Sequence, residues 1–133
     1  MNADDPRDLE ERTFKFAVRI VQFVKKMKYS KENEVIRYQL VKSATSIGAN
    51  YEEAQGAFSK NDFTYKIGIC FREAKETNYW LRIIKAAEII VDNGINDLIQ
   101  ESKELMNIFG SIMKKIHYRK EFTQGVRSDE KND

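Results

Sequence analysis

The residues of this 133-residue chain that could do chemistry are gathered in one stretch, residues 43–81. Glu73 and Glu76 lie about one helical turn apart, and paired carboxylates on facing helices are the ligand layout of di-iron bundles. Such a site also needs a histidine three residues after a glutamate. The only histidine, His117, lies far along the chain. The sequence therefore predicts no metal, and it argues against a metal-dependent bundle enzyme.

The same carboxylates can instead set the register of two packed helices. With a turn near residues 59–60, antiparallel pairing places Glu73 opposite Ser46 or Ile47, and Glu76 opposite Ser43 or Ala44. A buried carboxylate is costly unless it accepts hydrogen bonds. We therefore expect Glu73 or Glu76 to be largely buried and bonded to the facing helix. The predicted inter-helix polar network is Ser43, Ser46, Asn50, Glu53, Glu73 and Glu76.

The remaining reactive side chains fit structural roles. Cys70 lies on an apolar stripe, where a free cysteine behaves as a small core side chain. His117 follows two lysines and is expected at the surface, and Trp80 is expected to anchor the core or an interface. No motif for nucleophilic catalysis, nucleotide binding or structural zinc is present. The sequence therefore predicts a protein without enzymatic activity, catalytic residues or cofactors.

Basic residues follow one face of the first predicted helix. Arg12, Lys15 and Arg19 lie at spacings of three and four, and Lys26 falls on the same face. This is either a solvated face opposite the apolar stripe or a track for phosphates, which basic side chains can neutralise without reading base sequence. The net charge of +2 does not decide between the two. The predicted nucleic-acid-binding residues are Arg12, Lys15, Arg19, Lys26, Lys114, Lys115, Arg119 and Lys120.

Apolar residues recur at helical spacing along most of the chain. This periodicity predicts helices at about 9–29, 34–58, 62–91 and 97–119, and no strand pattern competes. Helices of this length with short connections fold back antiparallel, so we expect an all-α, up-down-up-down four-helix bundle over residues 1–121. Residues 122–133 are polar and contain glycine, which predicts a disordered tail. The expected helix caps are Asp8, Asn61 or Asp62, and Asn96, with Asp92-Asn93-Gly94 ending the third helix.

The apolar positions divide into expected core stripes and extra aromatics. The expected stripes are Phe16, Ile20, Phe23, Val24 and Met27; Val35, Leu40 or Val41, Ala44, Ile47, Tyr51 and Ala54; Phe63, Ile67, Cys70, Ala74, Thr77, Leu81 and Ile84; Ile99, Ser102, Met106, Phe109, Met113 and Ile116. Aromatics off these stripes are Phe14, Tyr38, Tyr65, Phe71 and Tyr79. Exposed apolar surface beyond the needs of one core predicts an interface.

The composition also indicates the cellular compartment of the protein. A single cysteine, Cys70, excludes an internal disulfide framework and fits a reducing compartment. The N-terminal residues are acidic and polar, unlike a signal peptide. No apolar run approaches the length of a membrane span. We expect a soluble, cytoplasmic protein.

Two sequence segments carry a family resemblance. The segments SIGANYEEA (46–54) and NDFTYKIGICFREAKETNYWL (61–81) resemble the small bacterial four-helix-bundle proteins known as 23S rRNA intervening-sequence proteins. The accessory variability determinants of diversity-generating retroelements are similar. The matching positions are Ser46, Ile47, Asn50, Glu53, Ala54, Phe63, Glu73, Ala74, Glu76, Thr77, Tyr79, Trp80 and Leu81.

The resemblance implies an antiparallel bundle that forms a homopentameric ring and has no enzymatic activity. It also implies contact with nucleic acid, because the retroelement relatives bind nucleic acid and a reverse transcriptase through basic surfaces. The net charge of +2 departs from those strongly basic relatives. The sequence thus favours a weak binder of structured RNA or DNA, or of a nucleoprotein. The alternative is a protein-interaction scaffold with no nucleic-acid role.

Overall fold

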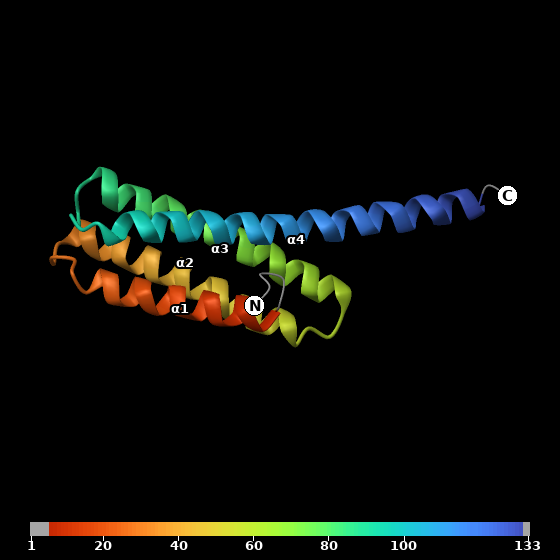
Figure 1. Cartoon of the computed structure of the whole chain (residues 1–133), viewed down its shortest axis with the longest axis horizontal. Helices are drawn as coiled ribbons and strands as arrows, with labels where there is room; N and C mark the ends of the chain where they lie inside the picture. The colour runs from red at the N-terminus through yellow and green to blue at the C-terminus, as the bar shows by residue number, and fades with distance from the viewer. Residues whose placement is uncertain (1–5, 132–133) are drawn as a thin grey trace.

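Four helices make up the computed structural model, which describes the backbone of residues 6–131 and the side chains of residues 8–119. The helices are Pro6–Val24 (α1), Lys31–Gln55 (α2), Lys60–Ala86 (α3) and Gly94–Lys131 (α4). They lie alongside one another as a bundle (Figure 1), and the described backbone contains no strand. The predicted all-α fold class is confirmed.

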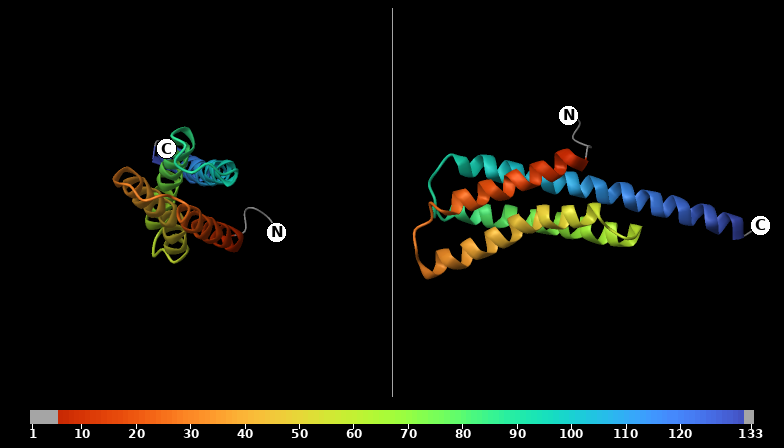
Figure 2. Two further views of the ribbon diagram at one scale, coloured as in Figure 1. Left: turned by 90° about the vertical axis from the view of Figure 1, so that its left-hand side faces the viewer. Right: turned by 90° about the horizontal axis from the view of Figure 1, so that it is seen from below.

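Hydrogen bonds between helices show the direction of each one. Thr77 bonds to Ser43 and Cys70 to Ile47, so α3 runs antiparallel to α2 in the register that the turn predicts. The ion pair Arg12–Glu101 joins α1 to α4, and Lys26–Asp92 joins the residues just after α1 to those just before α4, so these two helices are antiparallel as well. The helices therefore alternate up and down, as the view from below also shows (Figure 2).

Helix α4 is longer than the other three and extends beyond them (Figures 1 and 2). The helix continues to Lys131, so the backbone of residues 122–131 is helical where the sequence predicts a disordered tail. This segment contains Glu, Gln, Arg and Lys, which extend a helix readily, and one glycine costs only about 1 kcal/mol. Residues 132 and 133 lie outside the described part.

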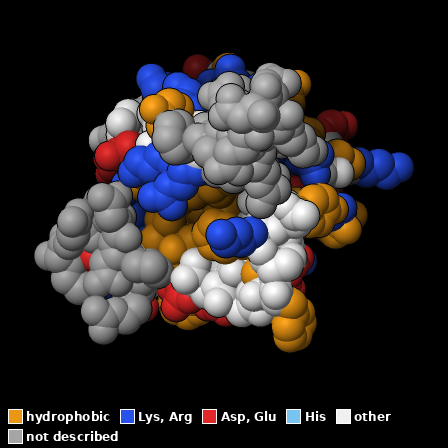
Figure 3. Space-filling view, turned by 90° about the vertical axis from the view of Figure 1, so that its right-hand side faces the viewer, with side chains coloured by type: hydrophobic (Ala, Val, Ile, Leu, Met, Phe, Trp, Pro, Cys, Tyr) orange, Lys and Arg blue, Asp and Glu red, His pale blue; other side chains and the backbone are white. Residues whose placement is uncertain are grey.

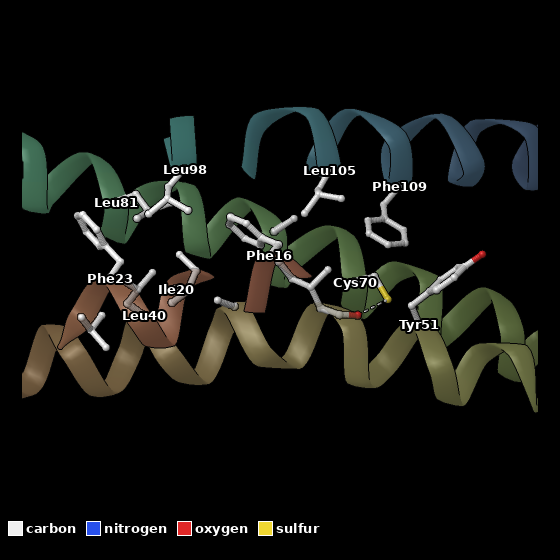
Figure 4. Packing of buried hydrophobic residues seen from close by; sticks show 14 of the residues in the cluster. Phe16, Ile20, Phe23, Leu40, Tyr51, Cys70, Leu81, Leu98, Leu105 and Phe109 are labelled. Atoms are coloured by element: carbon white, nitrogen blue, oxygen red, sulfur yellow. Dashed lines mark hydrogen bonds between the residues drawn. The ribbon is translucent and has the colours of Figure 1, made fainter. Parts of the chain in front are cut away.

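The core follows the predicted stripes of α1, α2 and α3 closely. The residues Phe16, Ile20, Leu40, Ile47, Ile67, Leu81 and Phe109 are among those fully enclosed. Figure 4 shows several of them, among them Phe16, Leu40 and Leu81, meeting between the helices, with Phe109 beside Tyr51. The inclusion of Val35 in the α2 stripe was wrong, because this side chain is 60% exposed near the start of α2.

The α4 stripe differs from the predicted one at two positions. Leu98 and Leu105 are buried, whereas the predicted Ile99 and Met106 are only half-buried and pack at the edge of the core. Ser102 and Phe109 are buried as predicted. Apolar residues occur in adjacent pairs along α4, as at Leu98-Ile99 and Leu105-Met106. The periodicity fits equally well whichever residue of each pair is buried.

The helix starts differ from the predicted caps. Asp8 lies inside the first turn of α1 rather than before it, because Pro6 suits the first helical position. Ser30 and Ser59 cap α2 and α3, each accepting a 3.0 Å hydrogen bond from a backbone N–H three residues on. At α4, the Asp92 carboxylate accepts a 2.7 Å bond from the Gly94 N–H.

Helix α3 ends before the predicted Asp92-Asn93-Gly94 stop. The Ile89 N–H donates to the Ile84 carbonyl and the Glu88 N–H to the Lys85 carbonyl, which is the Schellman arrangement of a helix end. Glu88 takes the left-handed conformation at φ 56°. Glycine normally fills this position of a helix end. Because Glu88 fills it here, the prediction that relied on Gly94 placed the end of the helix too late.

Candidate functional site

The predicted polar network forms through hydroxyls rather than carboxylates. The Thr77 hydroxyl donates across the helix pair to Ser43 Oγ at 2.9 Å, and the Ser43 hydroxyl donates to the Leu40 carbonyl at 3.1 Å. Ser46 donates to a carbonyl of its own helix, and Asn50 donates to the Ser46 carbonyl. Serine and asparagine side chains thus satisfy local backbone groups and need no carboxylate opposite them.

The carboxylates of Glu73 and Glu76 lie half-buried beside this helix pair. Glu76 accepts a 3.3 Å hydrogen bond from the Trp80 indole N–H on the same helix. Within residues 8–119, the Glu73 carboxylate accepts no hydrogen bond, so the expected bond from Glu73 or Glu76 to α2 is not formed. Burial raises the pKa of Glu73, and the neighbouring Glu76 charge raises it further, with Lys42 and Arg72 acting in the opposite direction. Burial and the Glu76 charge thus both disfavour the ionised form of Glu73.

Glu53, the sixth residue of the predicted network, pairs with a cation instead. Its carboxylate accepts a 2.7 Å hydrogen bond from Lys66 of α3, and this bond raises the pKa of the Lys66 ammonium. The pair lies near the α2–α3 turn and is open to solvent. It contributes to the register of the two helices but brings no further predicted residue into the network.

Cys70 is fully enclosed between α2 and α3, as predicted. Its thiol lies 3.5 Å from the Ile47 carbonyl (Figure 4), and burial raises its pKa to about 12. Because the thiolate is the nucleophilic form, this thiol is unreactive near neutral pH.

A direct test of this placement is the rate of thiol modification. We expect Cys70 in the folded protein to react with a neutral disulfide reagent at least about a hundredfold more slowly than in denaturant, because the thiol is both protonated and enclosed. Spectrophotometric titration with the reagent measures both rates. Equal rates in the folded and unfolded states would contradict the packing of α2 against α3.

The basic track on α1 is interrupted by acids from α4. The Arg12 guanidinium donates to both carboxylate oxygens of Glu101, at 2.8 and 2.7 Å, and lies 3.7 Å from Glu104. The hydrogen bonds to Glu101 raise the pKa of Arg12. A bidentate pair of this kind fixes α1 against α4. Arg12 therefore has a structural role. The local sequence around Arg12 could not reveal Glu101 as its partner, because Glu101 lies on another helix.

Lys26, at the other end of α1, also has an acidic partner. It pairs with Asp92, and this contact together with the Gly94 N–H lowers the pKa of the Asp92 carboxyl. Lys15 is exposed and lies 3.6 Å from Glu11 of its own helix. Arg19 is exposed and forms no ion pair with any residue whose side chain is described. Of the four predicted cations on α1, only Lys15 and Arg19 thus remain open to a partner.

The basic residues of α4 follow Ile112 and Met113, which pack against the edge of the core. Lys114, Lys115 and Arg119 are exposed, and neither lysine forms an ion pair with a side chain that the structure describes. The side chain of Lys120 lies outside the described residues. At a rise of about 1.5 Å per residue, Lys115 lies about 20 Å along α4 from Glu101. The two predicted basic groups are therefore separate surfaces rather than one continuous track.

The end of the molecule from which α4 projects combines apolar and basic surface. Figure 3 shows hydrophobic side chains in a recess on this end, with Lys and Arg side chains beside it. Of the aromatics predicted off the core stripes, Phe14, Tyr38, Tyr65 and Tyr79 are exposed, which leaves apolar surface on several helices. Phe71 packs instead toward Gly110 of α4.

Neither metal ligation nor membrane insertion is suggested by the described residues. Within residues 8–119, no three side chains of His, Cys, Asp or Glu are placed to hold one metal ion. His117 is exposed. No helix in the described part is long and apolar enough to span a bilayer.

Comparison with known proteins places this bundle in a family. A family model for the 23S rRNA-intervening sequence protein matches residues 8–111. The crystal structure of a protein of unknown function from the S23 ribosomal protein family of Bacteroides thetaiotaomicron VPI-5482 is 36% identical, with a TM-score of 0.72. The match covers 79% of this chain and 97% of that one. A search of curated proteins finds no match. The chain belongs to the 23S rRNA-intervening sequence protein family.

Proposed function

We propose that this protein is a non-enzymatic bundle that assembles with copies of itself and binds structured RNA or DNA through the exposed basic residues of α4. The observation that carries the proposal is the position of Lys114 and Lys115. Both are exposed on α4, and no described acid neutralises them. Exposed lysines that no acid neutralises can donate to a phosphate backbone.

The other basic residues have secondary roles in this proposal. Arg12 and Lys26 hold Glu101 and Asp92, so they are not available to phosphate. Arg119 is exposed one turn beyond Lys115 and extends the same basic segment. Contacts with phosphates neutralise charge without reading sequence, which supports a role in retaining nucleic acid rather than in selecting a site.

Self-assembly strengthens weak binding of this kind. Two or three phosphate contacts from one protomer give low affinity, but several copies in one assembly engage a strand together. A homopentameric ring, which the family resemblance implies, would carry five such helices. The exposed aromatic and aliphatic side chains of α1, α2 and α3 supply apolar surface for that assembly.

The experiment that tests the proposal is an electrophoretic shift series with the double variant Lys114→Glu/Lys115→Glu. The substitutions lie on exposed helix positions and leave the core untouched, so the fold should persist. We expect retention of a structured RNA to fall at least about tenfold relative to the wild type, because cations near phosphates become anions.

The matched control is Lys28→Glu/Lys31→Glu, which changes the net charge equally at the opposite end of the bundle. Both lysines are exposed. Local contact predicts that the control binds like the wild type. Equal losses in both double variants would show that binding follows net charge alone and would contradict a site on α4.

A protein-interaction scaffold is the second candidate. The observation in its favour is that Arg12 and Lys26 are used internally while apolar side chains such as Phe14 and Tyr38 are exposed. The scaffold predicts assembly without salt-sensitive retention of nucleic acid by the wild type. The same electrophoretic series therefore separates the two candidates.

A further inference from the structure

One exposed aromatic side chain lies among the basic residues of α4, beyond residues 8–111 that the family model matches. Tyr118 is 70% exposed, and Lys114 and Lys115 precede it by four and three residues. Residues at these two spacings are neighbours on a helix surface, with Cβ atoms about 5–6 Å apart. A long helical side chain also leans toward the turn that precedes it, which here carries the two lysines. Tyr118 is thus flanked by a cation on either side.

The Tyr118 ring faces away from the core. Phe109, which is fully enclosed, lies nine residues earlier, or about two and a half helical turns, so the two side chains point in opposite directions. Within residues 8–119, no cation, second ring or hydrogen-bond partner contacts Tyr118. By contrast, the exposed ring of Tyr38 carries the Lys42 ammonium of its own helix, 5.9 Å from the ring centroid. The Tyr118 ring therefore keeps its faces open to a group from outside the chain.

The charges around Tyr118 suit a polyanion. Of the α4 acids whose side chains are described, Glu104 is the closest in sequence, ten residues before Lys114, or about 15 Å along the helix. Neither Lys114 nor Lys115 forms an ion pair with a described side chain. Ser111, which is exposed about two turns before Tyr118, is uncharged. The described surface here thus joins an open ring to two unpaired cations.

We propose that Tyr118 stacks on an unpaired base while Lys114 and Lys115 contact the phosphates on either side of that base. The inference rests on the nucleic-acid binding in the proposed function and names the class of substrate. Bases in a duplex stack on one another, so an aromatic side chain stacks on a base that is unpaired. The ligand is therefore a single strand, or the loop of a structured RNA, rather than an uninterrupted duplex.

The test is fluorescence anisotropy of a labelled RNA strand without internal pairing, and of the same strand annealed to its complement. Tyr118→Ala should lower the affinity for the single strand about tenfold, because one stacked base is lost. Its affinity for the duplex should stay within about twofold of the wild type, since a duplex offers no base to the ring. Tyr118→Phe, which keeps the ring, should bind the single strand like the wild type.

Salt dependence separates stacking from a general disturbance of the helix. The Tyr118 ring neutralises no phosphate, so Tyr118→Ala should keep the wild-type slope of log affinity against log salt concentration. Lys114→Glu/Lys115→Glu should instead flatten that slope. A slope as flat in Tyr118→Ala as in the lysine variant would overturn the stacking role. Circular dichroism checks that all variants keep their helices.

Tyr29→Ala is the matched control. Tyr29 is 82% exposed and lies between Lys28 and Lys31 in the sequence, at the opposite end of the bundle. Lys28 lines a recess together with Glu88 and Asp92, so carboxylates accompany this second exposed ring. Tyr29→Ala should therefore bind both RNAs like the wild type. Equal losses in Tyr29→Ala and Tyr118→Ala would overturn a stacking site on α4.

The outcomes distinguish this inference from the proposed function. A wild type that binds neither RNA at low salt would refute nucleic-acid binding, and the stacking contact with it. A wild type that binds the single strand no better than Tyr118→Ala does would overturn stacking alone. Equal losses of Tyr118→Ala on the single strand and on the duplex would also overturn it, as would a loss in Tyr118→Phe as large as in Tyr118→Ala.

Discussion

Replacing Phe109 with alanine should lower the free energy of unfolding by about 3–5 kcal/mol, the largest effect expected of any single truncation in this chain. The Phe109 side chain is fully enclosed by the bundle and meets the Tyr51 ring edge-on, with centroids 5.7 Å apart. Its removal leaves a cavity between α2 and α4 and also loses the aromatic contact, which adds about 0.5–1.5 kcal/mol. Urea denaturation monitored by circular dichroism measures the change.

Phe58→Ala is the matched control for this substitution. Phe58 lies in the α2–α3 turn and is completely exposed, so its removal should change the stability by less than about 0.5 kcal/mol. All variants are compared at one protomer concentration, since assembly stabilises the folded state by mass action. Similar losses for Phe58→Ala and Phe109→Ala would contradict the described core.

Replacing Gly48 with leucine is expected to produce the second-largest loss, about 3 kcal/mol. A Cβ atom at Gly48 would lie 3.1 Å from Thr13 Oγ1 and 3.3 Å from Thr13 Cβ. Thr13 cannot move away easily, because its hydroxyl bonds to the carbonyls of Leu9 and Glu10 at 2.9 and 3.0 Å. A leucine therefore forces α1 and α2 apart. Thermal or urea unfolding reports the loss.

Gly68→Leu serves as the comparison in this case. Gly68 also lies inside a helix, but a Cβ atom there meets nothing within 4 Å. Because leucine is a better helix former than glycine, this variant should be neutral or up to about 1 kcal/mol more stable. If Gly48→Leu behaves like Gly68→Leu, the close approach of α1 and α2 at Thr13 is wrong.

The sequence predicts those features of the fold that follow from local periodicity. The stripes of α1 and α3 identify most of the core because apolar residues recur there at every third or fourth position. The register of α2 against α3 follows from the turn near residues 59–60, since a short turn leaves little freedom to slide. On α4, adjacent apolar residues such as Leu105 and Met106 both fit a helical stripe. Which of the two is buried is decided by how α4 packs in the bundle.

The candidate site depends on contacts that no local pattern contains. Arg12 looks like part of a phosphate track because its helical face is basic, but Glu101 reaches it from a helix that is distant in sequence. Ser46 looks like a donor to a carboxylate, but it bonds to the carbonyl four residues earlier. In both cases a nearer or better-aligned partner takes the hydrogen bond, and its geometry is set by the assembled bundle.

The measurement that tests the proposed function most directly is a salt titration of wild-type binding to structured RNA, followed by electrophoretic shift. We expect retention at low salt and a linear fall of log affinity with log salt concentration, because each neutralised phosphate releases condensed counterions. The slope should be steeper for an assembly than for the basic residues of a single protomer. Absence of any shift at low salt would contradict nucleic-acid binding and leave the interaction scaffold.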